Sequence, residues 1–265
     1  KDSGEYDGED VFETEMVPSA TKYMSFNDYL EIRCFTLYME IFYNQLFDEF
    51  IQFVLSMGFS GYDYMEVIKN KFQKHASKNL NDLRESFLRD TASEMMDTEE
   101  ALFEFYSKPE NYKKLIEGQI GCNVTFKHKA MATGNHLDDL TNFVNFCVKT
   151  LILKSKQKGN PDYEIMLKCI KEYVRCKMEG FLSSEVSKNR YVYKGEFDVK
   201  RWLENKTNEP IGKFKYPTTT VFGYSKSSKK FRDKLFDLYG ESMVGKITIL
   251  SRCHNIQKIL RTPFA

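Results

Sequence analysis

Apolar residues recur at helical spacing in several separate segments between residues 25 and 189. A Ser-Phe-Asn-Asp capping-box pattern begins at Ser25, and Gly58 and Gly61 follow the last apolar position. Between these limits the spacing i, i+3, i+4, i+7, i+8 marks one apolar face, which comprises Phe47, Phe50, Ile51, Val54 and Leu55. We therefore expect a single helix of about 30 residues from Ser25 to Gly58.

Further helices are expected downstream. Asn160 followed by Pro161 is typical of a helix N-cap and first helical position. Residues 117–137 contain three glycines and little periodicity, so we expect a short helix end followed by an irregular segment. The other segments with helical patterns are about 62–76, 79–107, which ends before Pro109, and 136–154.

The pattern changes near residue 190. Residues 191–199 alternate in polarity like a strand, and residues 218–224 are rich in β-branched and aromatic side chains. We further expect a helical turn at 201–205, a helix at 226–240, an extended segment at 245–250 and a helix at 252–261. Residues 1–10 are polar and expected to be mobile or extended.

These patterns predict a mostly α fold, a multi-helix bundle with a small α+β C-terminal tail. The expected organisation is an extended linker or strand over 1–24, the helical bundle over 25–189 and the mixed tail over 190–265.

The composition fits a soluble globular protein without a strongly charged surface. The 265 residues include 39 Lys+Arg and 38 Asp+Glu, a formal net charge of +1, so no long-range field favours nucleic acid or an anionic membrane. No apolar run reaches the roughly 18 residues of a membrane span, and the acidic first residues do not resemble a signal peptide. We therefore expect a cytoplasmic protein with six reduced cysteines, no membrane partner and no nucleic-acid partner.

No residue pattern specifies a catalytic centre. The cysteines form no CxxC pair and no CxxxCxxC triplet. His128 and His136, with Asp138 and Asp139 nearby, could hold a metal or form a hydrolase site, but their spacing matches no zinc pattern. Ser225 fits a helix cap better than a phosphate loop. We expect no catalytic, cofactor-binding or metal-binding residues in the chain.

Two separated stretches carry a family resemblance. The stretch ETEMVPSATKYMSFNDYLEIRCFTLYMEIFYN (13–44) resembles the segment that follows the barrel in cobalamin-binding radical S-adenosylmethionine proteins. That family has an E-x-E-x-V strand, a Ser/Thr link, MSF-x-D and a long aromatic helix with EIFYN. The second stretch, FDVKRWLENK (197–206) with LYGESMVGKITILSR (238–252), resembles the end of those proteins.

The resemblance implies that this chain is the C-terminal region of such a protein. The cobalamin-binding domain and the radical barrel, with its CxxxCxxC, would precede it in the same polypeptide and would be its partners. The parent would use a [4Fe–4S] cluster, S-adenosylmethionine and cobalamin, whereas this chain lacks every one of those cofactor motifs. It would then be an accessory domain that covers the barrel or has a structural role, without a catalytic centre of its own.

The resemblance also suggests which residues face the barrel or its substrate. These are Glu13, Glu15, Tyr38, Phe42 and Tyr43. The same acids could instead lie in solvent on a strand, and the aromatic residues could pack in a helical core. The alternative function is a standalone cytosolic helical domain that binds other proteins.

Overall fold

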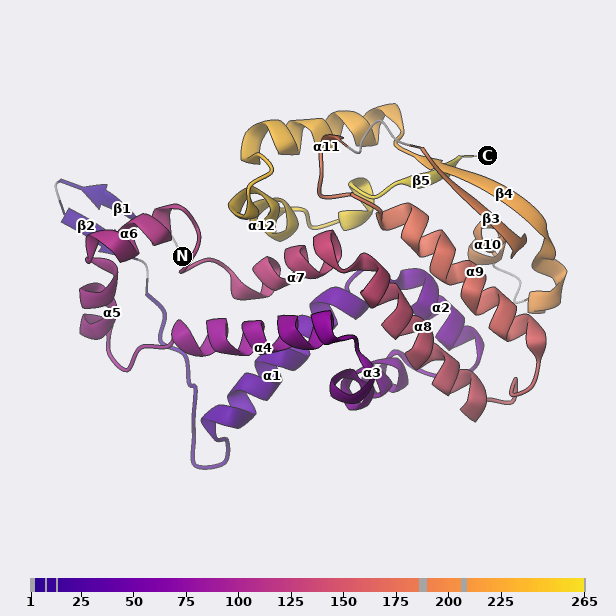
Figure 1. The fold of residues 1–265 in the computed structure, drawn as a ribbon, viewed down its shortest axis with the longest axis horizontal. Coiled ribbons are helices and arrows are strands. Elements are labelled where there is room, and N and C mark those ends of the chain that lie inside the picture. The colour runs from indigo at the N-terminus through magenta and orange to yellow at the C-terminus, as the bar shows by residue number, and fades with distance from the viewer. Residues whose placement is uncertain (1–2, 8, 13, 186–189, 206–208, 265) are drawn as a thin grey trace.

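The computed structural model describes residues 3–7, 9–12, 14–185, 190–205 and 209–264. Helices dominate the described chain, with a small antiparallel sheet near its C-terminal end, so the expected mostly α fold with an α+β tail is confirmed (Figure 1). The α-helices are α1 (Phe26–Tyr38), α2 (Asp48–Ser56), α3 (Gly61–His75), α4 (Lys78–Ser93), α5 (Glu99–Tyr106), α6 (Pro109–Ile116), α7 (Val124–Asn135), α8 (Leu137–Lys154), α9 (Pro161–Met178), α10 (Val199–Leu203), α11 (Lys226–Tyr239) and α12 (Met243–Arg252). The other helical elements are the π-helix η1 (Met39–Tyr43) and the 3-10 helices η3 (Ile211–Phe214) and η4 (Ile256–Lys258).

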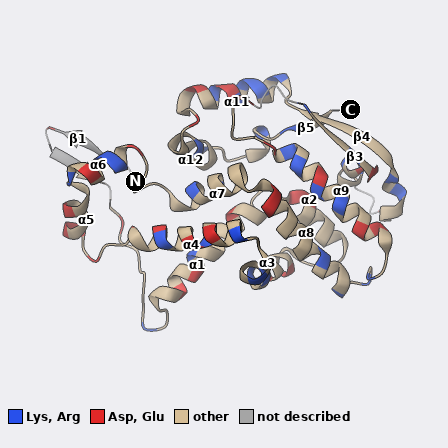
Figure 2. Cartoon of the chain, in the orientation of Figure 1, with Lys and Arg blue, Asp and Glu red and all other residues tan. Residues whose placement is uncertain are grey.

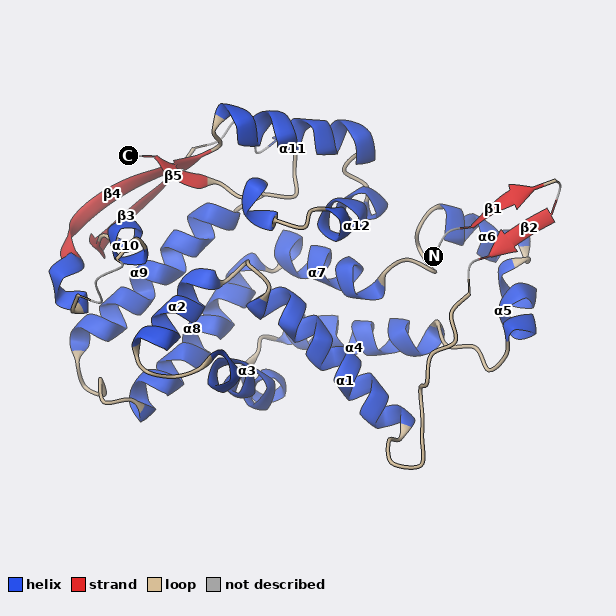
Figure 3. Cartoon of the chain, turned by 180° about the vertical axis from the view of Figure 1, so that it is seen from behind, coloured by secondary structure: helices blue, strands red, loops and turns tan. Residues whose placement is uncertain are grey.

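Two small sheets lie at opposite ends of the molecule (Figure 3). At one end, β1 (Ser3–Tyr6) and β2 (Glu9–Phe12) form an antiparallel hairpin. Phe12 anchors that hairpin on α5 and α6, since its ring centroid lies 5.4 Å from that of Phe103 and 6.2 Å from that of Tyr112. At the other end, β3 (Tyr191–Phe197), β4 (Lys215–Gly223) and β5 (Thr262–Phe264) form a sheet of order β3-β4-β5.

One hydrophobic core joins the bundle to the tail. Its buried residues run from Cys34 on α1 to Leu260 beside β5. Helix α9 packs on the C-terminal sheet, where the ring of Tyr173 makes edge contacts with those of Tyr193 and Phe222 at 5.7 and 4.7 Å. Aromatic packing therefore holds the strands and the helices in one folded unit.

Two buried arginines close the C-terminal end of α9. Arg232 on α11 donates to the carbonyl oxygens of Phe181 and Ser183, and Arg261 donates to that of Glu179. Both guanidinium groups also lie on the ring of Tyr224, at 4.9 and 5.2 Å from its centroid. The carbonyl oxygen of the C-cap residue Glu179 and those of the loop that follows α9 thus accept from cations, which also suit the negative end of the helix dipole.

The expected single helix over residues 25–58 is wrong. The capping box at its start is confirmed, since Ser25 Oγ accepts from Asp28 N and the Asp28 carboxylate accepts from Ser25 N at 2.8 Å. Helix α1 then widens into η1, and the chain turns at Gln45, which has φ +69°, before α2 begins. The apolar pattern does not reveal this turn, because the residues that follow Gln45, Leu46 and Phe47, are apolar and fully buried like those of a helix facing the core.

The expected helix over 79–107 is interrupted as well. Helix α4 ends at Ser93, and Thr98 starts α5 with its Oγ1 accepting from Ala101 N at 3.1 Å. Pro109 lies after the end of α5 and is the first residue of a further helix, α6.

The irregular segment expected over 117–137 contains helix α7. Asn123 caps it, with Oδ1 accepting from Phe126 N at 3.1 Å. Helix α7 contacts α4, α8, α12 and η1, and its buried residues include His128, Lys129 and Thr133. Because polar side chains are buried with apolar ones around this helix, it shows no amphipathic periodicity.

The last two expectations for the tail are also wrong. Residues 245–250 lie in helix α12, which Ser242 caps and in which Gly245 packs against the backbone of Tyr239 and Gly240. A Cβ at Gly245 would lie 2.2 Å from the Tyr239 carbonyl oxygen, so close helix packing prevails over the strand propensity of the β-branched residues here. The helix expected at 252–261 is replaced by η4, and β5 follows it.

Candidate functional site

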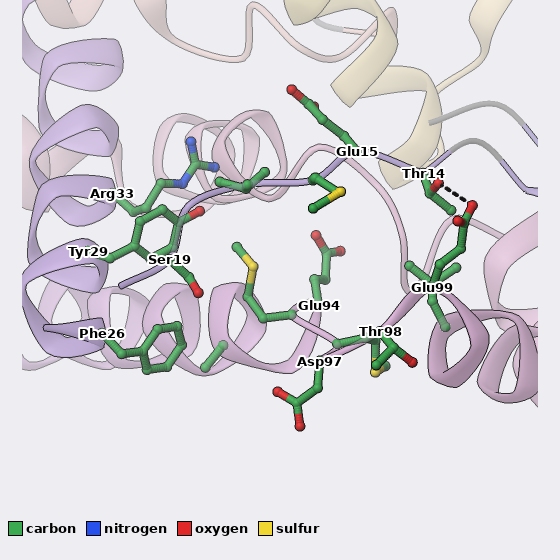
Figure 4. A pocket seen from close by; sticks show the side chains of 16 residues that line it. Thr14, Glu15, Ser19, Phe26, Tyr29, Arg33, Glu94, Asp97, Thr98 and Glu99 are labelled. Atoms are coloured by element: carbon green, nitrogen blue, oxygen red, sulfur yellow. Dashed lines mark hydrogen bonds between the residues drawn. The ribbon is translucent and has the colours of Figure 1, made fainter. Parts of the chain in front are cut away.

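A cavity of about 930 Å³ lies between the extended segment after β2 and helices α1, α4 and α5. The extended segment 14–19 forms one wall, the N-terminal half of α1 a second, and the junction between α4 and α5 a third (Figure 4). Segments that are distant in the sequence therefore meet around one open space.

The α1 wall presents residues at i, i+3 and i+7. The rings of Phe26 and Tyr29 stack at 6.1 Å with an interplanar angle of 12°, and Arg33 lies one turn further along beside Tyr29 (Figure 4). The Ser25 capping box fixes the start of α1 and hence the position of this face.

The α4–α5 junction supplies methionines and acids. Its lining residues are Ala92, Glu94, Met95, Met96, Asp97, Thr98, Glu99 and Leu102. The carboxylate of Glu94 points into the cavity, whereas Asp97 points away from it at the edge (Figure 4). The helix break between Ser93 and Glu99 brings these consecutive residues to one opening.

The extended segment is fastened at one point on this junction. Thr14 Oγ1 donates to Glu99 Oε1 at 2.9 Å (Figure 4). Beyond that contact Met16 is 99% accessible to solvent, and Tyr23, between this segment and α1, is 90% accessible. Single apolar side chains are common on protein surfaces, so these two show only that the stretch 14–24 packs little against the described helices.

Charges around the cavity are mainly negative. Glu15, Glu94, Asp97 and Glu99 provide four carboxylates against the single guanidinium of Arg33, a formal balance of −3. Elsewhere Lys/Arg and Asp/Glu are interspersed along the helices (Figure 2), in keeping with the net charge of +1 for the whole chain.

The structure places the five sequence-predicted contact residues in different surroundings. Glu15 is exposed at the edge of the cavity, and Glu13 lies outside the described residues. Tyr38 and Phe42 lie in the core at 5% and 0% exposure, where Tyr38 stacks on Phe72 at 4.4 Å. Tyr43 is 41% exposed and covers Gly61, away from the cavity.

The histidine pair is not assembled into a site. His128 is fully buried, with Nδ1 2.9 Å from the carbonyl oxygen of Val124 and Nε2 3.3 Å from Ser86 Oγ. His136 has Nδ1 3.8 Å from Asp139 Oδ2. Among the described residues no group of three His, Cys, Asp or Glu is arranged to hold a metal ion.

The chain matches no protein-family model, no curated protein and no solved structure. Within the described residues, no helix has the length and apolar character needed to cross a bilayer. The relationship to cobalamin-binding radical proteins therefore stays a prediction that depends on the residues quoted above.

Met95 and Met96, which line the cavity at the α4–α5 junction, were not among the residues predicted from the sequence. The signal was present in the run Glu94-Met95-Met96-Asp97, where neighbouring apolar residues stand between acids. Within a continuous helix these residues would point in different directions, so only the unexpected break after Ser93 brings them to one opening.

Proposed function

We propose that this chain is the C-terminal accessory domain of a cobalamin-dependent radical S-adenosylmethionine enzyme. In this proposal it acts in the cytoplasm, has no reaction centre of its own and covers the open mouth of an upstream barrel. The observation that carries the proposal is the exposed segment 14–24, which bears the family resemblance and leaves Met16 and Tyr23 almost fully accessible.

A domain that covers the mouth of the barrel would serve the radical chemistry of such an enzyme. A radical intermediate needs a site from which water is excluded, and a covering domain supplies that exclusion while helping to position the substrate. Burial of Met16 and Tyr23 against another domain would stabilise the contact, since apolar area removed from water contributes about 25 cal/mol per Å².

The first test is the mass and N-terminal sequence of the polypeptide in its native source. A species much larger than 31.2 kDa, with a CxxxCxxC upstream of Lys1, is the expected result. A native product that begins at or near Lys1 would contradict the proposal and would favour a standalone interaction domain.

The second test asks whether the exposed segment contacts the rest of the enzyme. In the full-length protein, Tyr23→Ser should reduce the product formed per S-adenosylmethionine cleaved, because a looser cover admits water. Tyr62→Ser is the matched control, since Tyr62 on α3 is 74% exposed and lies outside the segment. An equal amount of product per S-adenosylmethionine cleaved in the two variants would count against a covering role.

A further inference from the structure

Three methionines from two segments line the 930 Å³ cavity, which we call the methionine groove. Met16 comes from the extended segment, and Met95 and Met96 come from the α4–α5 junction. Methionine side chains are flexible and polarisable, so a surface made of them adapts to apolar groups of different shape. Phe26 and Tyr29 add an aromatic wall on α1.

The charges of the methionine groove point to the sign of its ligand. Four carboxylates and one guanidinium surround it, although the chain as a whole has a net charge of +1. The negative character is therefore local and is not a general property of the protein surface. Like charges placed around one opening repel, and a cationic occupant would relieve that repulsion.

The groove is large enough to admit side chains of a protein segment. Its volume of about 930 Å³ lies at the upper end of the range of about 300–1,000 Å³ that is typical of ligand pockets. Methionine and aromatic walls, with one carboxylate inside the cavity and others at its edge, are the complement of an amphipathic segment with basic side chains.

We propose that the methionine groove binds a basic amphipathic segment of a protein partner. Apolar side chains of that segment contact Met16, Met95 and Met96, and its Lys or Arg side chains pair with Glu15 and Asp97 at the edge. The identification of the partner as the covered barrel rests on the proposed function, whereas the chemistry of the groove does not.

The direct test is binding of a synthetic peptide. The isolated chain is titrated against a fluorescent helix-patterned Leu/Lys peptide and against the Leu/Glu peptide of the same pattern, and anisotropy is recorded. The Leu/Lys peptide should bind, more weakly as salt rises, and the Leu/Glu peptide should not. Equal affinity for the two peptides would overturn the proposal.

Two pairs of variants locate the binding. Met16→Lys with Met95→Lys should weaken the Leu/Lys peptide about tenfold or more, while the control Met243→Lys, at a methionine 37% exposed on α12, should not. The double variant Glu15→Lys with Asp97→Lys should weaken binding of the Leu/Lys peptide to a similar extent. Its control is Glu66→Lys, at an exposed position on α3. Thermal unfolding of each variant confirms that it is folded.

Each remaining outcome has a defined meaning. Binding that is unchanged in both groove variants would place the peptide elsewhere and refute the proposal. Helix α11 also carries a basic face, comprising Lys226, Lys229, Lys230 and Lys234. If the chain self-associates and the groove variants lose that self-association, the groove binds a second copy of this chain. That result would overturn the proposal of a separate protein partner. Peptide binding together with a native product starting at Lys1 would uphold the groove and reject only the radical-enzyme assignment.

Discussion

Gln45 adopts φ +69°, in the left-handed region that favours glycine, and its side chain explains why glutamine stands there. Its Oε1 accepts from Ile256 N at 3.0 Å, and its Nε2 donates to the carbonyl oxygen of His254 at 3.3 Å. Gln257 Nε2 in turn donates to the Gln45 carbonyl oxygen at 2.6 Å. The turn between η1 and α2 is thus held by the C-terminal segment.

Two substitutions separate backbone strain from these hydrogen bonds. Gln45→Ala keeps the strained φ and loses both side-chain bonds, so it should lower the free energy of unfolding by about 2 kcal/mol. Gln45→Gly also loses the bonds but relieves the strain, and should be less damaging than alanine by about 1 kcal/mol. Urea unfolding of the two variants and the wild type gives the order, and alanine more stable than glycine would contradict this explanation.

His128 is the residue most suited to a pH test. Burial lowers the pKa of its imidazole below the usual 6.5, while the Val124 carbonyl oxygen and Asp90 favour the charged form less strongly. As pH falls below 6.5, the unfolded chain therefore takes up a proton at His128 more readily than the folded protein does.

Stability should consequently decrease on acidification through this window. The free energy of unfolding should fall as pH drops from 6.5 towards the lowered pKa of the folded state, with a slope of at most about 1.4 kcal/mol per pH unit for this one group. The measurement is urea unfolding from pH 7.5 to pH 5 for the wild type and for His128→Gln. The glutamine variant should lack this part of the slope, and identical slopes would show that another group is responsible.

At the scale of elements, a buried ion pair joins α2 to α9. Lys177 Nζ lies 2.6 Å from both carboxylate oxygens of Glu49, and the two side chains are 5% and 9% exposed. Such a pair costs desolvation energy, but removal of one partner leaves a buried charge unpaired.

Glu49→Gln should therefore destabilise the protein by about 3–5 kcal/mol, whereas Glu49→Leu with Lys177→Met should be close to neutral or stabilising. The matched control is the Lys149–Glu164 pair, at 3.2 Å and with side chains 50% and 43% exposed, where Glu164→Gln should cost about 1 kcal/mol or less. Thermal and urea unfolding measure all three. A double variant as unstable as Glu49→Gln would show that the pair itself is needed.

Local signals predicted several of the helices. Helices α3, α8 and α11 follow the expected ranges, α9 begins at the expected Asn160–Pro161 restart, and Asn160 and Ser225 cap their helices as expected. Helices α7 and α12 could not be predicted in this way, since α7 buries polar side chains and α12 owes its conformation to packing against Tyr239 and Gly240. Tertiary contacts decided those two elements.

For the whole molecule, the sequence indicated one side of the candidate site and missed the other. The segment carrying Glu15 was identified, but its neighbour at the α4–α5 junction depends on a helix break that no proline or glycine marks. The lining residues between 14 and 33 lie 59 or more residues before those between 92 and 102, so the cavity needs the fold before it can be recognised.

The fastening of segment 14–19 can be tested on the whole protein. Thr14→Val removes the hydrogen bond to Glu99, which is worth about 0.5–1.5 kcal/mol. Thermolysin cleavage near Met16 should then become about two- to tenfold faster if opening precedes cleavage, with the melting temperature nearly unchanged. Thr248→Val, at a half-buried threonine on α12 whose Oγ1 donates to the Val244 carbonyl oxygen, is the control. An unchanged rate would show that Thr14 does not restrain the segment.

The hydrogen bonds of Gln45 have a consequence for synthesis on the ribosome. The partners of this turn, His254, Ile256 and Gln257, leave the ribosome more than 200 residues after it. Contacts of such long sequence separation form late and slow folding. The corner between η1 and α2 therefore lacks these hydrogen bonds until residues 254–257 have left the ribosome, and a chaperone that binds the nascent chain has that interval in which to act.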